Sequence, residues 1–236
     1  MTRPTEAVVL ARCDHVARTF GTGLGAVVAV HDITCEIHAR QQLAITGPSG
    51  SGKSTLLHLL AGLDAPTTGA VIWPALGARD DLRPGPVGVV FQGPSLLPPL
   101  DVAENVALPL LLGGASEADA RAAARAALTR LDLSALAAKL PEELSGGQAQ
   151  RVAVARVLAG RPRLILADEP TGQLDHASAA VIVDALLEAA AHVGAALVVT
   201  THDPVVAARL TTRWAMVDGS FADPHRRLEG NLSCSA

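Results

Sequence analysis

Aromatic residues and cysteines are both scarce in this chain. Tyrosine is absent, and aromatic residues make up 2% of the 236 residues. The three cysteines, Cys13, Cys35 and Cys234, are scattered without any C-x-x-C spacing. That distribution is typical of reduced cytosolic thiols and argues against a cysteine metal site.

The chain also lacks a block of basic residues and a long apolar run. The net charge is −4, and Arg226 and Arg227 are too short a pair to form a basic patch, so nucleic acid is not a predicted partner. No apolar run approaches the roughly 18 residues that a membrane span requires. Residues 1–6 lack the apolar core of a signal peptide. We therefore expect a cytosolic chain without a pore of its own.

The most informative segment matches the phosphate-loop pattern G-x-x-x-x-G-K-[ST]. An apolar strand-like run, 42–46, precedes it, and a helix-like run, 55–61, follows it. Its glycines allow consecutive N–H groups to converge on phosphate oxygens at the positive end of the helix. A Gly/Ser-rich turn with one exposed lysine is the alternative, but every fixed position is filled. The predicted ATP-binding residues are Gly47, Pro48, Ser49, Gly50, Ser51, Gly52, Lys53, Ser54 and Thr55, with Lys53 on the β- and γ-phosphates and Ser54 on Mg²⁺.

A second apolar strand, 164–167, ends in two acids. After a phosphate loop, the first acid of such a strand, Asp168, is expected to hold Mg²⁺, directly or through its water shell. Glu169 is placed to polarise a water for in-line attack on the γ-phosphate. Taken alone, the two acids are as well explained by turn and cap chemistry before Pro170. The upstream phosphate loop favours the catalytic interpretation.

Two further strand ends carry polar candidates. Gln92 follows the apolar run 87–91, and its amide is suited to Mg²⁺ or to the attacking water. His202 follows the strand 196–200, one element after the acids, where it could donate to the γ-phosphate. A strand-end glutamine in a turn and a histidine capping a strand are the alternatives that apply without the other motifs.

With these motifs in place, the chain resembles the nucleotide-binding subunits of ABC transporters. The signature Leu-Ser-Gly-Gly-Gln at 144–148, followed by the run 151–156, is highly specific for that family. The resemblance implies that the signature contacts ATP through Ser145, Gly146, Gly147 and Gln148. It also assigns Asp175 to a D-loop that contacts nucleotide and His202 to the switch position.

The resemblance extends to one branch, with two departures. The segments 54–67, 105–108 and 170–175 resemble the macrolide-exporter and lipoprotein-releasing branch. The adenine-stacking position, usually tyrosine, is Phe20 here, which keeps the ring face needed for stacking. The segment 73–86 is short and rich in Pro and Gly, so we expect a loop where the branch carries a helix.

The order of predicted elements gives the fold. Strands alternating with helices predict an α/β phosphate-loop NTPase core with a mostly parallel sheet. Short antiparallel strands in 7–38 predict an N-terminal β subdomain that carries Phe20. We expect one nucleotide-binding domain over 1–236, with a helical subdomain inserted at about 93–160 and a polar tail at 219–236. Within the insertion, a helix capped by Ser116 is expected to bury Ala120, Ala123, Ala127, Leu128 and Leu131, and another helix is expected over 149–159.

The function implied is ATP hydrolysis that powers a separate membrane permease. The resemblance implies that the signature does not reach its own γ-phosphate and instead closes the site of a second ATP-binding subunit, paired head to tail. The chain is then expected to be peripheral on the inner face of the membrane. A non-transport ABC ATPase of the cell-wall-remodelling type, which also works through a membrane partner, is the alternative. A nucleotide-binding module without hydrolysis is opposed by Glu169 and His202.

Overall fold

A six-stranded, mostly parallel sheet forms the centre of the computed structural model, which describes residues 7–172 and 174–222. Its strand order is β5-β6-β7-β3-β8-β9. Every neighbouring pair is parallel except the last, which is antiparallel. The strands are β5 (Val87–Val90), β6 (Leu164–Asp168), β7 (Ala196–Thr201), β3 (Gln42–Thr46), β8 (Thr212–Val217) and β9 (Ser220–Phe221). Parallel strands need crossovers, and the helices between them supply these.

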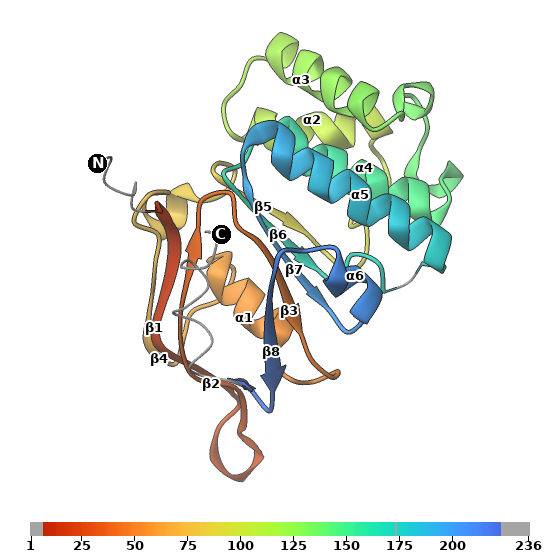
Figure 1. Cartoon of the computed structure of the whole chain (residues 1–236). Helices are drawn as coiled ribbons and strands as arrows, with labels where there is room; N and C mark the ends of the chain where they lie inside the picture. The colour runs from red at the N-terminus through yellow and green to blue at the C-terminus, as the bar shows by residue number, and fades with distance from the viewer. Residues whose placement is uncertain (1–6, 173, 223–236) are drawn as a thin grey trace, which may run out of the picture.

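Alternate residues of the central strands enter two separate hydrophobic cores. On β6, Leu164 and Leu166 pack on the side of helix α1 (Lys53–Leu60), while Ile165 and Ala167 pack on the opposite side. Because both faces are buried, these strands read as continuous apolar runs. Figure 1 shows α1 on one side of the sheet and helices α4 (Gly146–Ala159) and α5 (His176–Val193) on the other.

A three-stranded antiparallel sheet, ordered β2-β1-β4, covers the α1 side. Its strands are β1 (Val9–Phe20), β2 (Val27–His38) and β4 (Thr68–Ile72). The antiparallel subdomain was predicted, but the short strands expected in 7–38 are two strands of 12 residues each, joined at 21–26. Cys13 and Cys35 lie opposite each other, buried and free. A hydrogen bond with Cys35 and burial raise the pKa of the Cys13 thiol well above its usual range.

The segment between β5 and β6 is helical, as its sequence predicts. It contains α2 (Val102–Leu112), α3 (Glu117–Arg130) and α4, which pack against one another (Figure 1). Asn105 on α2 is fully buried, and its side chain bonds the backbone of Leu97, Leu100 and Asp101. The segment 73–86, described throughout, forms turns and one 3-10 helix, Arg79–Asp81, in agreement with the loop expected there.

The structure corrects two boundaries and one buried position of the sequence prediction. The helix expected over 149–159 starts at Gly146, because Ser145 and Gln148 form a capping box that includes the signature glycines. Ala124, not Ala123, is the buried alanine in the middle of α3. The polar tail expected from residue 219 begins as β9, since Phe221 packs its ring on Trp214, 5.2 Å between centroids; residues 223–236 of that tail lie outside the described residues.

The chain closes with the short helix α6 (Pro204–Ala208), which is capped by Asp203. Within residues 7–172 and 174–222, no helix is both long and apolar enough to cross a membrane.

Candidate functional site

The phosphate loop follows β3 and ends at the first residue of α1, Lys53. Two of its glycines are required by close backbone contacts. A Cβ on Gly47 would lie 2.2 Å from the Met216 carbonyl oxygen, and one on Gly52 would lie 2.2 Å from that of Ala29. Both have positive φ angles, 155° and 91°. Neighbouring strands therefore clamp both ends of the loop, in a conformation that favours glycine.

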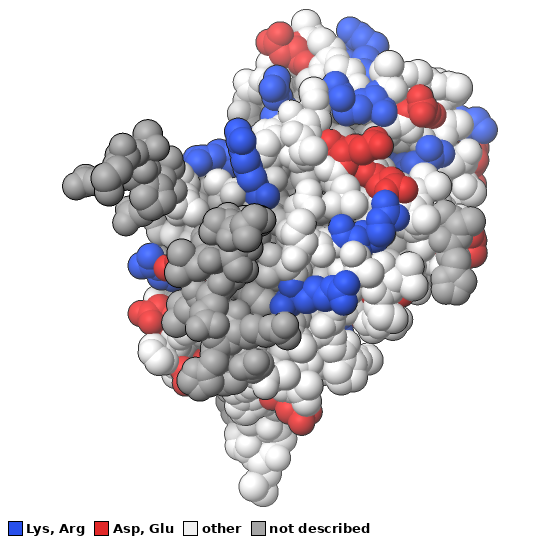
Figure 2. Space-filling view, viewed as in Figure 1, with Lys and Arg blue, Asp and Glu red and all other residues white. Residues whose placement is uncertain are grey.

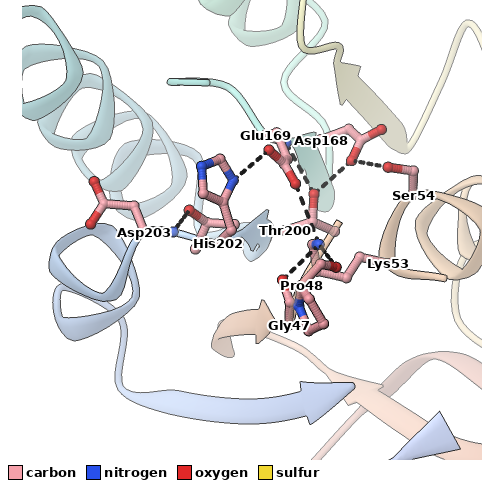
Figure 3. Close-up of polar contacts among 10 residues, drawn as sticks. Gly47, Pro48, Lys53, Ser54, Asp168, Glu169, Thr200, His202 and Asp203 are labelled. Carbon is pink, nitrogen blue, oxygen red and sulfur yellow. Dashed lines mark hydrogen bonds and ion pairs between the residues drawn. The ribbon is translucent and has the colours of Figure 1, made fainter. Parts of the chain in front are cut away.

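Lys53 lies at the centre of a polar network, with its side chain only 4% exposed. Its Nζ donates to the carbonyl oxygens of Gly47 and Pro48, 2.9 Å each, and lies 3.4 Å from Glu169 Oε1 (Figure 3). A buried ammonium is stabilised only when it is paired and hydrogen-bonded. The loop thus holds the Lys53 ammonium group at the N-terminal end of α1. The positive charge and the helix dipole both favour binding of an anion there. Ser51 Oγ in the same loop is buried without a hydrogen-bond partner among the described residues.

Asp168 is the last residue of β6, and its carboxylate accepts hydrogen bonds from two hydroxyl groups. Ser54 Oγ donates to its Oδ1 at 2.8 Å, and Thr200 Oγ1 donates to the same oxygen at 2.6 Å. Its other oxygen, Oδ2, lies 3.8 Å from His58 Nε2. The predicted Mg²⁺ residues Ser54 and Asp168, 114 positions apart in sequence, are therefore in direct contact. A hydroxyl and a carboxylate oxygen are of the type that Mg²⁺ prefers.

Glu169 is held from both its backbone and its side chain. Its N–H donates to Thr200 O at 3.1 Å and to Thr200 Oγ1 at 3.0 Å, and its φ is +39°. Its Oε2 lies 2.8 Å from His202 Nδ1, as Figure 3 shows. A left-handed conformation is costly for glutamate, and such outliers cluster at functional sites. The strained backbone turns the carboxylate toward Lys53 and His202.

Gln92 lies beside the same carboxylate. A Cβ built on Gly172 would lie 3.3 Å from Gln92 Nε2 and 3.5 Å from Glu169 Oε2. The structure therefore brings Lys53, Asp168, Glu169, His202 and Gln92 to one edge of the sheet. That edge is formed by the carboxyl ends of the parallel strands, where α/β proteins bind ligands.

The signature residues lie apart from this network. Ser145 caps α4, accepting from Gln148 N at 3.3 Å, and is exposed. A Cβ on Gly146 would meet Leu174, and one on Gly147 would meet Ser178. Among the described residues, no hydrogen bond joins 145–148 to the phosphate loop. Asp175 caps α5 by accepting from Ser178 N at 3.0 Å. The start of α5, where Asp175 lies, is therefore next to the signature glycines.

Phe20 ends β1 and is 43% exposed. Its strand partner is Val27, two residues before Ala29, whose carbonyl closes on Gly52. Because a strand rises about 3.3 Å per residue, the backbone position opposite Phe20 lies roughly 7 Å along β2 from the residue that contacts the phosphate loop.

Sequence reasoning missed Thr200 and His58. Thr200 Oγ1 donates to Asp168 and accepts from Glu169 N, so it fixes both acids. Two polar threonines closing an otherwise apolar strand, 196–201, were the available signal. His58 lies within the helix-like run 55–61, and nothing in its spacing indicates a position beside Asp168.

Comparison with known proteins gives a consistent result. A family model described as ABC transporter matches residues 30–172. The lipoprotein-releasing system ATP-binding protein LolD of Shewanella denitrificans is 39% identical over 233 residues, covering 95% of this chain and 100% of that protein.

Two solved structures share the fold. The dimeric post-hydrolysis structure of the ATP-binding cassette MJ0796, bound to ADP and Pi, matches with a TM-score of 0.81 and 35% identity, covering 91% of this chain and 97% of that one. CbiO1 from Clostridium perfringens, part of the transporter complex cbiONQ, matches with a TM-score of 0.78 and 26% identity, covering 91% and 87%. These likenesses confirm the predicted α/β phosphate-loop fold and the resemblance to the lipoprotein-releasing branch.

Proposed function

This chain belongs to the ABC transporter family, and we propose that it drives a membrane permease as one of two cassettes paired head to tail. It is an ATP-binding and ATP-hydrolysing subunit that works with a separate membrane component. The observation that carries the proposal is the cluster of Lys53, Asp168, Glu169 and His202 at one sheet edge, while the exposed signature residues Ser145 and Gly146 lie at the start of α4, on the side of the sheet opposite α1 (Figure 1).

Catalysis at this cluster is positioning plus electrostatics, because phosphoryl transfer leaves little covalent work for the protein. Lys53 meets the β- and γ-phosphates by exchanging its bonds to the loop carbonyls for phosphate oxygens. Glu169 accepts a proton from the attacking water, and His202 orients that carboxylate through its 2.8 Å contact. Gln92, at the end of the adjoining strand, is the residue whose amide would contact the attacking water or Mg²⁺.

Ser54 and Asp168 are the residues that would hold Mg²⁺. When bound, Mg²⁺ would neutralise the negative charge that develops on the phosphate oxygens. Thr200 keeps the Asp168 carboxylate in place by donating to the oxygen that also accepts from Ser54.

The signature completes the site of a second copy. Ser145 caps α4 and Gly146 begins it, and both are small and exposed, while Gly147 is half-buried. The N-terminus of a helix binds anions through free N–H groups and its dipole. A γ-phosphate held by the partner's Lys53 supplies that anion, and Asp175 lies beside the same contact. ATP therefore joins the two subunits, and its hydrolysis releases them in a two-state switch.

We further propose that residues 1–236 act as one nucleotide-binding domain, in which the helical subdomain at about 93–160 passes the movement to the permease. The chain would lie in the cytoplasm, on the inner face of the membrane. Lys and Arg are interspersed with Asp and Glu on the face shown in Figure 2, which supports the absence of a nucleic-acid partner.

Purification of the tagged chain from detergent-solubilised membranes tests this function. We expect an integral membrane protein to co-purify in fixed proportion, and ATPase activity of that complex to disappear in Glu169→Gln. The proposal is wrong if neither the wild type nor Glu169→Gln retains an integral membrane protein.

A further inference from the structure

The exposed ring of Phe20 has an arginine on one face. The Arg18 guanidinium carbon lies 4.5 Å from the ring centroid. Arg18 and Phe20 are two positions apart on β1, so their side chains project from the same face of the strand. A guanidinium over a ring within about 6 Å is attracted by the negative charge of the ring face.

Arg18 is itself fixed by an acid from another element. Its Nε donates to Asp64 Oδ2 at 2.8 Å, and both side chains are 26% exposed. Asp64 Oδ1 accepts from Ala65 N at 2.7 Å, which fixes the carboxylate in turn. Asp64 lies just beyond α1, the helix that begins at the phosphate loop.

The same connection is fastened to β1 at two more points. Thr67 N donates to Ala17 O at 2.8 Å, and Thr67 Oγ1 accepts from Thr19 N at 3.0 Å. The backbone around Arg18 and Phe20 is therefore held against the segment that leaves α1. These bonds connect the segment that follows α1 to the strand that carries the ring.

Phenylalanine carries no polar group that could anchor its ring. Only contacts with its faces and edges can fix its orientation, and Val27 beside it is itself 62% exposed. The guanidinium is the charged contact on this ring, and it occupies one of the two faces.

We propose that Arg18 is a positioning residue for the nucleotide base: held by Asp64, its guanidinium covers one face of Phe20 and presents the other face to adenine. This rests on the proposed ATP-binding function and adds the arrangement of the base subsite. The base then completes a guanidinium–phenyl–adenine stack, and it gains from a ring that does not have to be ordered on binding.

Binding of ATP and of inorganic tripolyphosphate to the isolated chain separates base contacts from phosphate contacts. We expect Arg18→Ala to weaken ATP binding about three- to tenfold, with tripolyphosphate affinity unchanged. KM for ATP should rise by the same factor while kcat at saturation stays constant, because base binding is uniform between ground and transition states. Arg18→Lys and Asp64→Asn should each give a smaller loss of ATP affinity.

Arg12→Ala is the matched control. Arg12 lies on the same strand and pairs with Glu36 at 2.7 Å, away from the ring, so its loss should change neither affinity. In a Phe20→Ala background, Arg18→Ala should have no further effect on ATP affinity, since the two residues act through one stack.

The proposal is overturned if Arg18→Ala weakens ATP and tripolyphosphate equally, which would indicate general damage to the site. Unchanged or tighter ATP binding would also overturn it, since Arg18 would then be irrelevant to the base or would block it. The proposed function fails separately, if the wild-type chain itself binds no ATP.

Discussion

Glu169 and His202 face each other from the ends of two neighbouring parallel strands, with Glu169 Oε2 2.8 Å from His202 Nδ1. The same carboxylate reaches Lys53 through its other oxygen, 3.4 Å away. One side chain therefore links the phosphate loop to the switch histidine. A carboxylate held on both sides is oriented before a water reaches it, and such orientation contributes to rate.

Loss of the histidine should release that carboxylate without removing it. We expect His202→Ala to keep ATP affinity within about twofold while kcat falls by about 10²-fold, the scale of a misplaced catalytic group. Steady-state hydrolysis with a parallel binding assay gives both values. Asp203→Ala is the control, because Asp203 caps α6 through Val205 N instead of contacting Glu169. An unchanged kcat in His202→Ala would rule out the orienting role.

Replacement of the buried lysine should affect binding as well as turnover. Lys53→Ala removes charged hydrogen bonds worth about 1.5–3 kcal/mol each, so ATP affinity should fall at least roughly tenfold. Fluorescence titration measures it, with Lys139→Ala, the chain's other lysine, as control. Equal ATP affinity in Lys53→Ala and the wild type would contradict the assignment of 47–55 as the phosphate loop.

A substitution in the signature should spare the chain's own nucleotide and harm the partner's. We expect Ser145→Arg to bind ATP almost normally but to lose dimerisation and hydrolysis, because the added bulk and charge fill the place of the γ-phosphate. Ser116→Arg is the matched control, because Ser116 caps α3 as Ser145 caps α4. This variant should keep dimerisation and ATP hydrolysis.

Mixing Ser145→Arg with Lys53→Ala extends this test. One composite site then joins a sound phosphate loop to a sound signature, so activity should return in part unless both sites must fire together. Normal hydrolysis by Ser145→Arg alone, with permease present, would exclude a shared site.

The buried amide of Asn105 should matter for stability. Its Oδ1 accepts from Leu97 N at 2.7 Å, and its Nδ2, which carries two hydrogens, lies within hydrogen-bond distance of three carbonyl oxygens in the loop after Gln92. Asn105→Ala leaves the N–H of Leu97 and the carbonyl of Leu100 without these bonds and should lower the free energy of unfolding by about 2–4 kcal/mol. Urea denaturation measures this free energy. As the control, Glu104→Ala on the exposed face of α2 should lower it by less than about 1 kcal/mol. Equal losses in the two variants would contradict the role given to the buried amide.

The central sheet and the phosphate loop could be predicted from sequence because their causes are local. Strand β6, 164–168, is a continuous apolar run, as a strand buried on both faces must be. The phosphate-loop glycines have fixed spacing, and the order of strands and helices then requires crossovers. The start of α4 was predicted three residues late because a capping box at Ser145 outweighs the low helix propensity of two glycines.

The contacts that sequence reasoning missed are those between distant segments. Asp64 holding Arg18 spans 46 positions, and Thr200 holding Asp168 spans 32. Neither pair has a spacing that periodicity can detect. The facing of Cys13 and Cys35 depends on the register of β1 and β2, which their hairpin sets with several irregularities.

The mass of Glu169→Gln in the presence of ATP tests the catalytic base and the ATP-bridged pair most directly. This change removes the base while keeping the shape of the side chain, so ATP should remain bound and uncleaved. Size-exclusion chromatography with light scattering should show twice the 24.1 kDa mass of the chain with ATP, and a monomer with ADP. A Glu169→Gln chain that stays monomeric in saturating ATP and still hydrolyses it at the wild-type rate would contradict both the assignment of the base and the head-to-tail pair.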